Sequence, residues 1–121
     1  MKIFLDDIRN PYDVFILTVD PLYEKNESWE IIRSHDEFIE CISAHGVPKL
    51  VSFDHDLDQG HYLPENQTAI NYSAMDVKCG YHSLKWLIEY CYGKGEELPE
   101  IIIHSQNIEG KKNMESLLQR N

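Results

Sequence analysis

The chain has 121 residues, of which 42% are hydrophobic, and 21 acidic against 11 basic side chains give it a formal net charge of −10. This length and composition are typical of one globular domain, so we expect a single domain over residues 1–121. The negative charge argues against bulk binding of DNA or of an anionic membrane, although a divalent cation can bridge such a protein to a small nucleotide or an RNA end. The apolar runs are too short for a membrane span or a secretory signal, and we expect a cytoplasmic protein.

The first half of the chain contains three apolar segments with the pattern of buried strands. A strand is expected over residues 1–5, because the apolar run of residues 3–5 is followed directly by acids, as is typical of a central strand in a parallel sheet. Residues 8–27 carry two prolines and no sustained helical period, so we expect irregular structure there, with an extra strand over residues 14–19 as the alternative. Further strands are expected over residues 29–33 and 50–53.

Three helices are expected, and helix signals mark the ends of the first two. Ser34 and Glu37 have the spacing of a capping box, and Gly46 is suited to end the helix that follows. A second helix is expected over residues 76–92, before Gly93 and Gly95. A fourth strand over residues 101–103 and a last helix over residues 113–120 complete the chain.

The order of these elements predicts an α/β fold. Helices between successive strands imply right-handed crossovers and a parallel sheet of about four strands. The carboxyl ends of all the strands then lie at one edge of the sheet, which is where ligands bind in open parallel α/β sheets.

Four acids follow two of the expected strands. Asp6 and Asp7 come after the first strand, and Asp54 and Asp56 come after the third. Carboxylate oxygens are preferred ligands of Mg²⁺ and Mn²⁺, so we expect Asp6, Asp7 and Asp54 to hold such a divalent metal. Capping of helices and turns is the alternative for any one of these aspartates.

Two histidines and Asp56 are the candidate catalytic residues. His104 follows the fourth strand and can act as a general acid or base, while His55 and Asp56 can orient ligands or water. The alternative for His55 is a side chain that faces away from its neighbouring acids and packs under a helix. Arg9, Ser105 and Asn107 are candidates for binding phosphate oxygens, with a surface ion pair as the alternative for Arg9. Glycine-rich phosphate loops are lacking, which excludes classical dinucleotide and ATPase sites.

Four motifs that span nearly the whole chain resemble a known family. The first two are Ile3–Arg9 (IFLDDIR) and Ser52–Leu57 (SFDHDL). The third consists of Gly80 and Tyr81 together with Leu84–Leu87 (LKWL). The fourth is Ile103–Asn107 (IHSQN) with Gly110, Asn113 and Met114. The paired acids and Asp54 resemble the receiver domain of two-component signalling. The full set is more similar to the cyclic-phosphate-processing receiver-like family.

The resemblance implies a three-layer, flavodoxin-like receiver fold, found in bacteria and their phages, that processes cyclic phosphate ends of RNA or nucleotides with its acids and histidines. A true receiver has a fifth strand with a lysine, which we expect this chain to lack, so phosphorelay is not expected. His104 replaces the small hydroxyl residue of the receiver pattern, which favours hydrolysis over storage of phosphate. Residues 58–79 are longer than the family pattern suggests, and Tyr62, Gln67, Tyr72 and Lys78 in this segment could form a substrate lid or a partner surface.

We therefore predict a metal-dependent phosphoesterase that acts on a small nucleotide or an RNA end. The main alternative is a non-catalytic receiver-like binding module, such as a phage protein that binds a host protein. A weaker alternative assigns Asp54 and Asp56 to a haloacid-dehalogenase phosphatase, whose downstream lysine and acid pair has no evident counterpart here.

Overall fold

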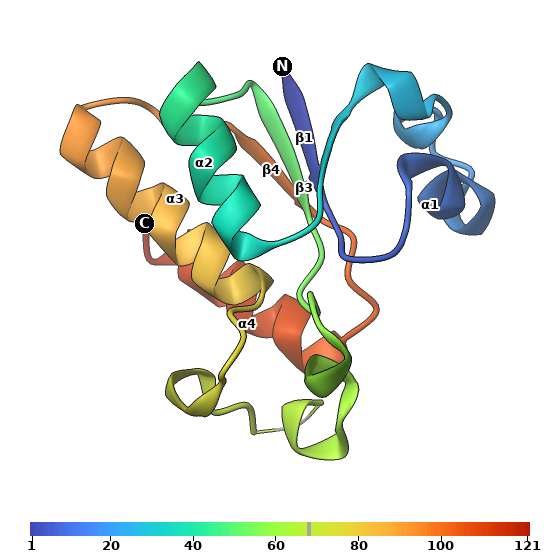
Figure 1. Ribbon diagram of the computed structural model, residues 1–121, viewed down its shortest axis with the longest axis vertical. Coiled ribbons are helices and arrows are strands. Elements are labelled where there is room, and N and C mark those ends of the chain that lie inside the picture. The colour runs from blue at the N-terminus through green and yellow to red at the C-terminus, as the bar shows by residue number, and fades with distance from the viewer. Residues whose placement is uncertain (68) are drawn as a thin grey trace.

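Four short parallel strands form the centre of the molecule. The structure is a computed structural model that describes residues 1–67 and 69–121. Its strands are β1 (Lys2–Leu5), β2 (Glu30–Ile32), β3 (Leu50–Phe53) and β4 (Glu100–Ile103). They form one sheet in the order β2-β1-β3-β4, and every neighbouring pair is parallel. Figure 1 shows β1, β3 and β4 of this sheet. The predicted parallel α/β fold is confirmed, and the described residues contain no fifth strand.

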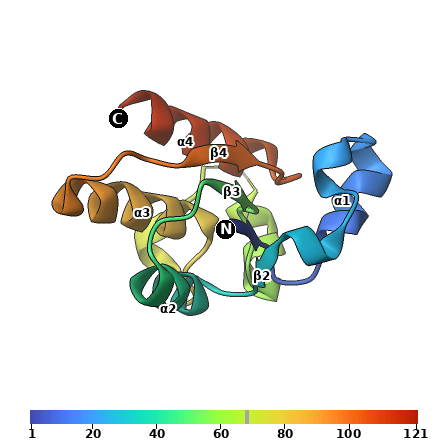
Figure 2. The ribbon, with the colours of Figure 1, turned by 90° about the horizontal axis from the view of Figure 1, so that it is seen from above.

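The alternation of side chains along the strands divides the core into two parts. Ile3 and Leu5 of β1 pack with apolar residues of α2 (His35–His45), α3 (Gly80–Lys94) and α4 (Ile108–Gln119). Phe4 points to the opposite face, where it packs with α1 (Pro11–Thr18) and with residues 22–31. The result is the three-layer arrangement that the receiver-like fold predicts, with α1 lying apart from the other three helices (Figure 2).

The prediction for residues 8–27 was wrong, because this segment contains helix α1. Pro11 occupies the first helical position, where its missing N–H costs nothing, and the backbone N–H of Asn10 donates to Asp13 Oδ2 over 2.8 Å. Ile16 and Leu17 are exposed, so the helix has no continuous apolar stripe and its period is hidden in the sequence.

The other helices agree with the sequence in type and differ in their limits. Helix α2 begins after Ser34, whose Oγ accepts from the backbone N–H of Glu37 over 3.2 Å, as predicted. Helix α3 begins at Gly80 rather than at residue 76. Helix α4 begins at Ile108, five residues before the predicted start, because the side chain of Asn107 caps it. Within the described part of the chain, no helix has both the length and the apolar character needed to cross a bilayer.

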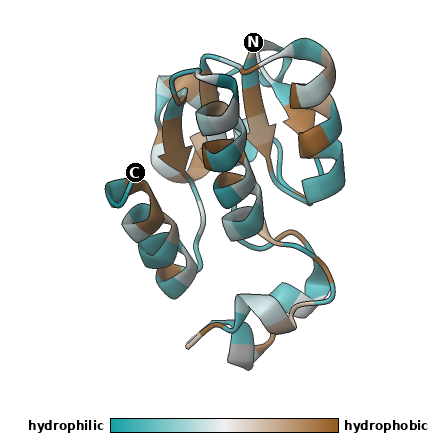
Figure 3. Cartoon of the chain, turned by 90° about the vertical axis from the view of Figure 1, so that its left-hand side faces the viewer, coloured by the Kyte–Doolittle hydropathy of each residue, from teal (hydrophilic) through white to brown (hydrophobic). Residues whose placement is uncertain are grey.

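The segment between β3 and α3 lies beyond the carboxyl ends of the strands. Its described residues contain three short 3-10 helices, Gln59–Tyr62, Pro64–Asn66 and Tyr72–Ala74. Figure 3 shows the hydrophobic strands above this more polar segment. It therefore lies at the edge of the sheet where the sequence places the candidate site.

Candidate active site

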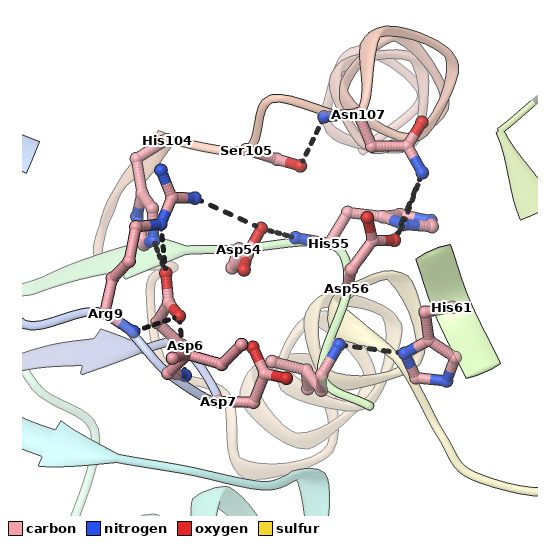
Figure 4. A network of polar contacts seen from close by, with 12 residues as sticks. Asp6, Asp7, Arg9, Asp54, His55, Asp56, His61, His104, Ser105 and Asn107 are labelled. Atoms are coloured by element: carbon pink, nitrogen blue, oxygen red, sulfur yellow. Dashed lines mark hydrogen bonds and ion pairs between the residues drawn. The ribbon is translucent and has the colours of Figure 1, made fainter. Parts of the chain in front are cut away.

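Asp6 and Asp54 are brought together because they continue neighbouring strands. The backbone N–H of Asp54 donates to the carbonyl of Leu5, and that of Asp6 donates to the carbonyl of Ile32, so both residues extend the ladder of the sheet. The two aspartates are only 1% and 3% exposed. Among the described residues, Asp6, Asp54 and His104 form one group whose possible ligand atoms all lie within 4.8 Å of one another (Figure 4).

The carboxylate of Asp6 is held on both of its oxygens. Its Oδ1 accepts from the backbone N–H groups of Ile8 and Arg9 at 3.0 and 2.8 Å, and its Oδ2 accepts from Arg9 Nε at 3.2 Å and His104 Nε2 at 3.1 Å. Burial acts to raise the pKa of Asp6, but the hydrogen bonds from His104 and the backbone outweigh it, and the pKa lies below its usual value. Asp6 is therefore ionised at neutral pH.

The carboxylate of Asp54 has fewer hydrogen bonds and a more distant positive charge than that of Asp6. Its Oδ1 accepts from the backbone N–H of His55 at 2.8 Å, and Arg9 Nη2 lies 3.9 Å away. Burial and the neighbouring charge of Asp6 raise the pKa of Asp54 to about 8. Two buried carboxylates beside a single guanidinium are short of positive charge, and their hard oxygens are the donor set that Mg²⁺ or Mn²⁺ prefers.

His104 is the middle member of a buried chain of hydrogen bonds. Its Nε2 lies 3.1 Å from Asp6 Oδ2, its Nδ1 lies 2.7 Å from Ser52 Oγ, and Ser52 Oγ lies 2.7 Å from the hydroxyl of Tyr23. The imidazole is stacked on Phe4 with ring centroids 4.4 Å apart. Burial lowers the pKa of His104 in spite of its hydrogen bond to Asp6. The ring is therefore neutral near physiological pH.

The direction of this chain follows from the chemistry of its members. An ionised carboxylate can only accept, so His104 Nε2 carries the proton, and Nδ1 of the neutral ring must accept from the Ser52 hydroxyl. The Ser52 oxygen then accepts from Tyr23. Because Nε2 is a donor here, the oxygens of Asp6 and Asp54 remain as the candidate metal ligands in this group. Sequence reasoning missed Ser52 and Tyr23, although a serine inside the apolar run 50–53 was a signal.

His55 and Asp56 belong to a second network, next to the first. His55 is fully buried, and its Nδ1 lies 2.7 Å from Asp56 Oδ1 while its Nε2 lies 2.9 Å from the hydroxyl of Tyr72. The structure does not bring the His55 ring to Asp6 and Asp54, so a direct contact of His55 with a substrate there is not supported. The alternative interpretation is closer to the structure, because the His55 ring packs against Gly110 of α4. It is wrong in one respect, since the ring does not face away from Asp56 but contacts it.

Two glycines allow the helices to approach these histidine and aspartate residues. A Cβ atom on Gly80 would overlap the backbone carbonyl of Asp54, and a Cβ atom on Gly110 would overlap the ring of His55. The backbone N–H of Gly80 donates to the carbonyl of His55 at 2.7 Å. Both positions thus require glycine for lack of space, which explains the glycines in the Gly80–Leu87 motif and in α4.

Asp7, which the sequence also suggested as a metal ligand, does not belong to the buried group of Asp6, Asp54 and His104. It is partly exposed, and its Oδ1 accepts from the hydroxyl of Tyr62 at 3.3 Å. Burial and the charge of Asp6 raise the pKa of Asp7. Adjacent residues at a strand end point in different directions, so the structure brings only one of this pair to Asp54.

The remaining predicted residues divide between binding and structure. Arg9 lines a pocket of about 660 Å³ together with Asp6, Asp54 and Asp56. Asn107 also lines this pocket, but its side chain donates to Asp56 Oδ1 and accepts from the backbone N–H of Gly110. Ser105 lines a neighbouring pocket instead, and its Oγ accepts from the backbone N–H of Asn107 at 3.0 Å.

The segment over residues 58–79 contributes to this pocket in part. Tyr62 and Gln67 line it, whereas Tyr72 contacts His55 and stacks on Tyr81 with ring centroids 3.9 Å apart. Lys78 is exposed. Tyr72 thus anchors the segment, while Tyr62 and Gln67 face the candidate site.

Comparison with known protein families assigns this chain to one family. The family model described as "Cyclic-phosphate processing Receiver domain" matches residues 1–120. Searches of curated proteins and of solved structures give no match. Because the family model covers nearly the whole chain, including both buried aspartates and His104, the chain belongs to the family of cyclic-phosphate-processing receiver domains.

Proposed function

We propose that this protein is a metal-dependent phosphoesterase that opens cyclic phosphates of small nucleotides or of RNA ends. The observation that carries the proposal is the buried pair of Asp6 and Asp54, which share Arg9 as an ion-pair partner, line one pocket and lie beside the Nε2–H group of His104. The family to which the chain belongs supports the choice of cyclic phosphates.

In this proposal Asp6 and Asp54 hold Mg²⁺ or Mn²⁺. Such an ion would polarise the phosphoryl group and would supply positive charge that offsets the phosphate and the two carboxylates. Arg9, which contacts both aspartates and lines the pocket, provides the second positive charge for the phosphate oxygens.

In this proposal His104 acts on the leaving oxygen and Asp56 acts on the attacking water. Hydrolysis breaks one P–O bond of the cyclic phosphate and forms another to the attacking water, whose proton goes to the alkoxide that the broken bond leaves. The Nε2–H group of the neutral His104 ring donates a hydrogen bond to the negative charge that develops on this alkoxide. Ser52 and Tyr23 keep this tautomer by donating along the chain to Nδ1. Asp56, which is positioned by His55 and Asn107, orients the attacking water from the same pocket.

Incubation of the purified protein with 2′,3′-cyclic nucleotides and Mg²⁺ or Mn²⁺ tests this proposal. We expect nucleoside monophosphates as products, detected by phosphorus NMR or chromatography, and we expect EDTA to abolish their formation. Metal binding without any product would instead favour the non-catalytic binding module.

Replacement of His104 by alanine is expected to lower turnover by about a hundredfold, because the loss of one hydrogen-bond donor to the developing charge costs at least about that much. The affinity for Mg²⁺ should change little, since both carboxylates remain. Initial rates and calorimetric metal titrations measure the two effects separately. His45→Ala, on the exposed end of α2, is the matched control and should behave like the parent. Hydrolysis by His104→Ala at the parent rate would remove His104 from the mechanism.

The affinity for Mg²⁺ is expected to rise with pH up to about pH 8. Because the pKa of Asp54 in the metal-free protein is raised to about 8, a proton competes with the metal below that pH. Each unit of pH below it should weaken binding by up to about tenfold, and binding should level off above it. Calorimetric titrations between about pH 6 and about pH 9 give this profile. An affinity that does not change between about pH 6 and about pH 8 would contradict the assignment of Asp54 as a ligand.

A further inference from the structure

The pocket above Asp6 and Asp54 has an apolar rim in addition to its charged floor. Ile8, Leu17 and Tyr62 line it and are 68%, 59% and 48% exposed. They come from the loop after β1, from α1 and from the segment after β3, so three separate parts of the chain place a large apolar side chain at one pocket. Exposed apolar side chains gathered around a pocket are typical of a ligand-binding surface.

The ring of Tyr62 is fixed at this rim by a polar contact. Its hydroxyl donates to Asp7 Oδ1 at 3.3 Å, while about half of the side chain remains exposed. This contact also gives Asp7 a role that does not depend on metal binding. A restrained aromatic ring next to a phosphate-binding floor presents a flat surface on which a planar group can stack.

Two amide side chains line the same pocket. Gln67 donates from its Nε2 to the carbonyl of His61 at 2.8 Å, which holds the side chain in place, and Gln106 lies on an exposed turn before α4. Amide groups can donate to and accept from the polar edge of a nucleobase. A cyclic phosphate without a base would leave both the apolar rim and these amides unused.

We propose that Tyr62, Leu17 and Ile8 form a nucleobase subsite, with Gln67 and Gln106 at the edge of the base. The ligand class is thus a nucleoside cyclic phosphate, either free or as the last nucleotide of an RNA, rather than a cyclic phosphate of a sugar or a polyol alone. This inference rests on the proposed function for the position of the phosphate, and it adds the part of the site that recognises the rest of the ligand.

Calorimetric binding of two probes in the presence of Mg²⁺ tests the subsite. The probes are adenosine 2′,3′-cyclic phosphate and methyl riboside 2′,3′-cyclic phosphate, which has the same sugar and phosphate and no base. Stacking on one aromatic side chain should make the nucleotide bind about tenfold more tightly. Tyr62→Ala and Leu17→Ala should remove most of this difference, whereas Tyr62→Phe should keep it.

Ile16→Ala is the matched control. Ile16 precedes Leu17 in α1 and is 63% exposed, but it does not line the pocket, so its loss should leave both affinities unchanged. Equal binding of the two probes, or an unchanged preference in Leu17→Ala and Tyr62→Ala, would overturn the subsite.

Hydrolysis assays with the same probes separate this inference from the proposed function. If both probes are hydrolysed equally well and bind equally, the phosphoesterase proposal stands and the subsite is wrong. If the nucleotide binds more tightly and neither probe is hydrolysed, the subsite stands and the phosphoesterase proposal fails.

Discussion

Replacement of Asp54 by asparagine is expected to abolish Mg²⁺ binding and to lower the hydrolysis of cyclic phosphates by about a thousandfold. The substitution keeps the shape of the side chain and removes one of the two carboxylates that we propose as metal ligands. Charge stabilisation by a metal contributes several kcal/mol to such reactions. Stability should change in the opposite direction. Because burial and Asp6 disfavour the ionised form of Asp54, the metal-free variant should unfold at a higher temperature than the metal-free parent, by a margin that grows from about pH 4 and levels off at about pH 8.

A loss of metal binding and hydrolysis together with a gain in stability distinguishes a metal site from a pair of acids that only supports the fold. Asp76→Asn removes the same charge from an exposed position in the segment before α3, and it should change neither metal affinity nor the unfolding temperature. Calorimetric titration, initial rates and thermal unfolding followed by circular dichroism measure all three properties. A variant Asp54→Asn that binds Mg²⁺ as the parent does would exclude Asp54 as a ligand.

Those elements could be predicted from the sequence whose burial in the core produces a run or a regular spacing of apolar residues. Strands β1 and β3 are covered on both faces, so all their residues except Lys2 and Ser52 are apolar, and the order of strands and helices is enough to predict a parallel sheet. Helix α1 could not be predicted in this way, because it covers its face of the sheet with few residues and leaves Ile16 and Leu17 exposed.

The candidate site could be predicted only to the level of strand ends. Topology alone brings Asp6, Asp54 and His104 to one edge of the sheet. The direction of each side chain depends on local contacts, and these turn Asp7 towards Tyr62 and use Asn107 as a helix cap. The contact between Asp7 and Tyr62 joins residues distant in sequence, and no pattern of spacing reveals it.

Gly80 connects the stability of the fold to the geometry of the site. It lies in the first turn of α3, and its N–H donates to the carbonyl of His55. A Cβ atom at this position would overlap the carbonyl of Asp54, which belongs to the backbone and cannot rotate away as a side chain can. The start of α3 can accommodate alanine only by moving away from the residues that follow β3.

Gly80→Ala is therefore expected to destabilise the protein by about 3 kcal/mol, at the upper end of the usual cost of overpacking, and to lower the unfolding temperature by about 10 °C. Gly93→Ala is the matched control, because Gly93 lies in the same helix and a Cβ atom there would meet no atom within 4 Å. That change should stabilise the protein by about 0.5 kcal/mol through helix propensity. Because displacement of α3 also shifts the carbonyl of Asp54, Gly80→Ala should weaken Mg²⁺ binding even where the variant is still folded, whereas Gly93→Ala should not. Equal unfolding temperatures for Gly80→Ala and the parent would show that α3 does not pack against Asp54 as described.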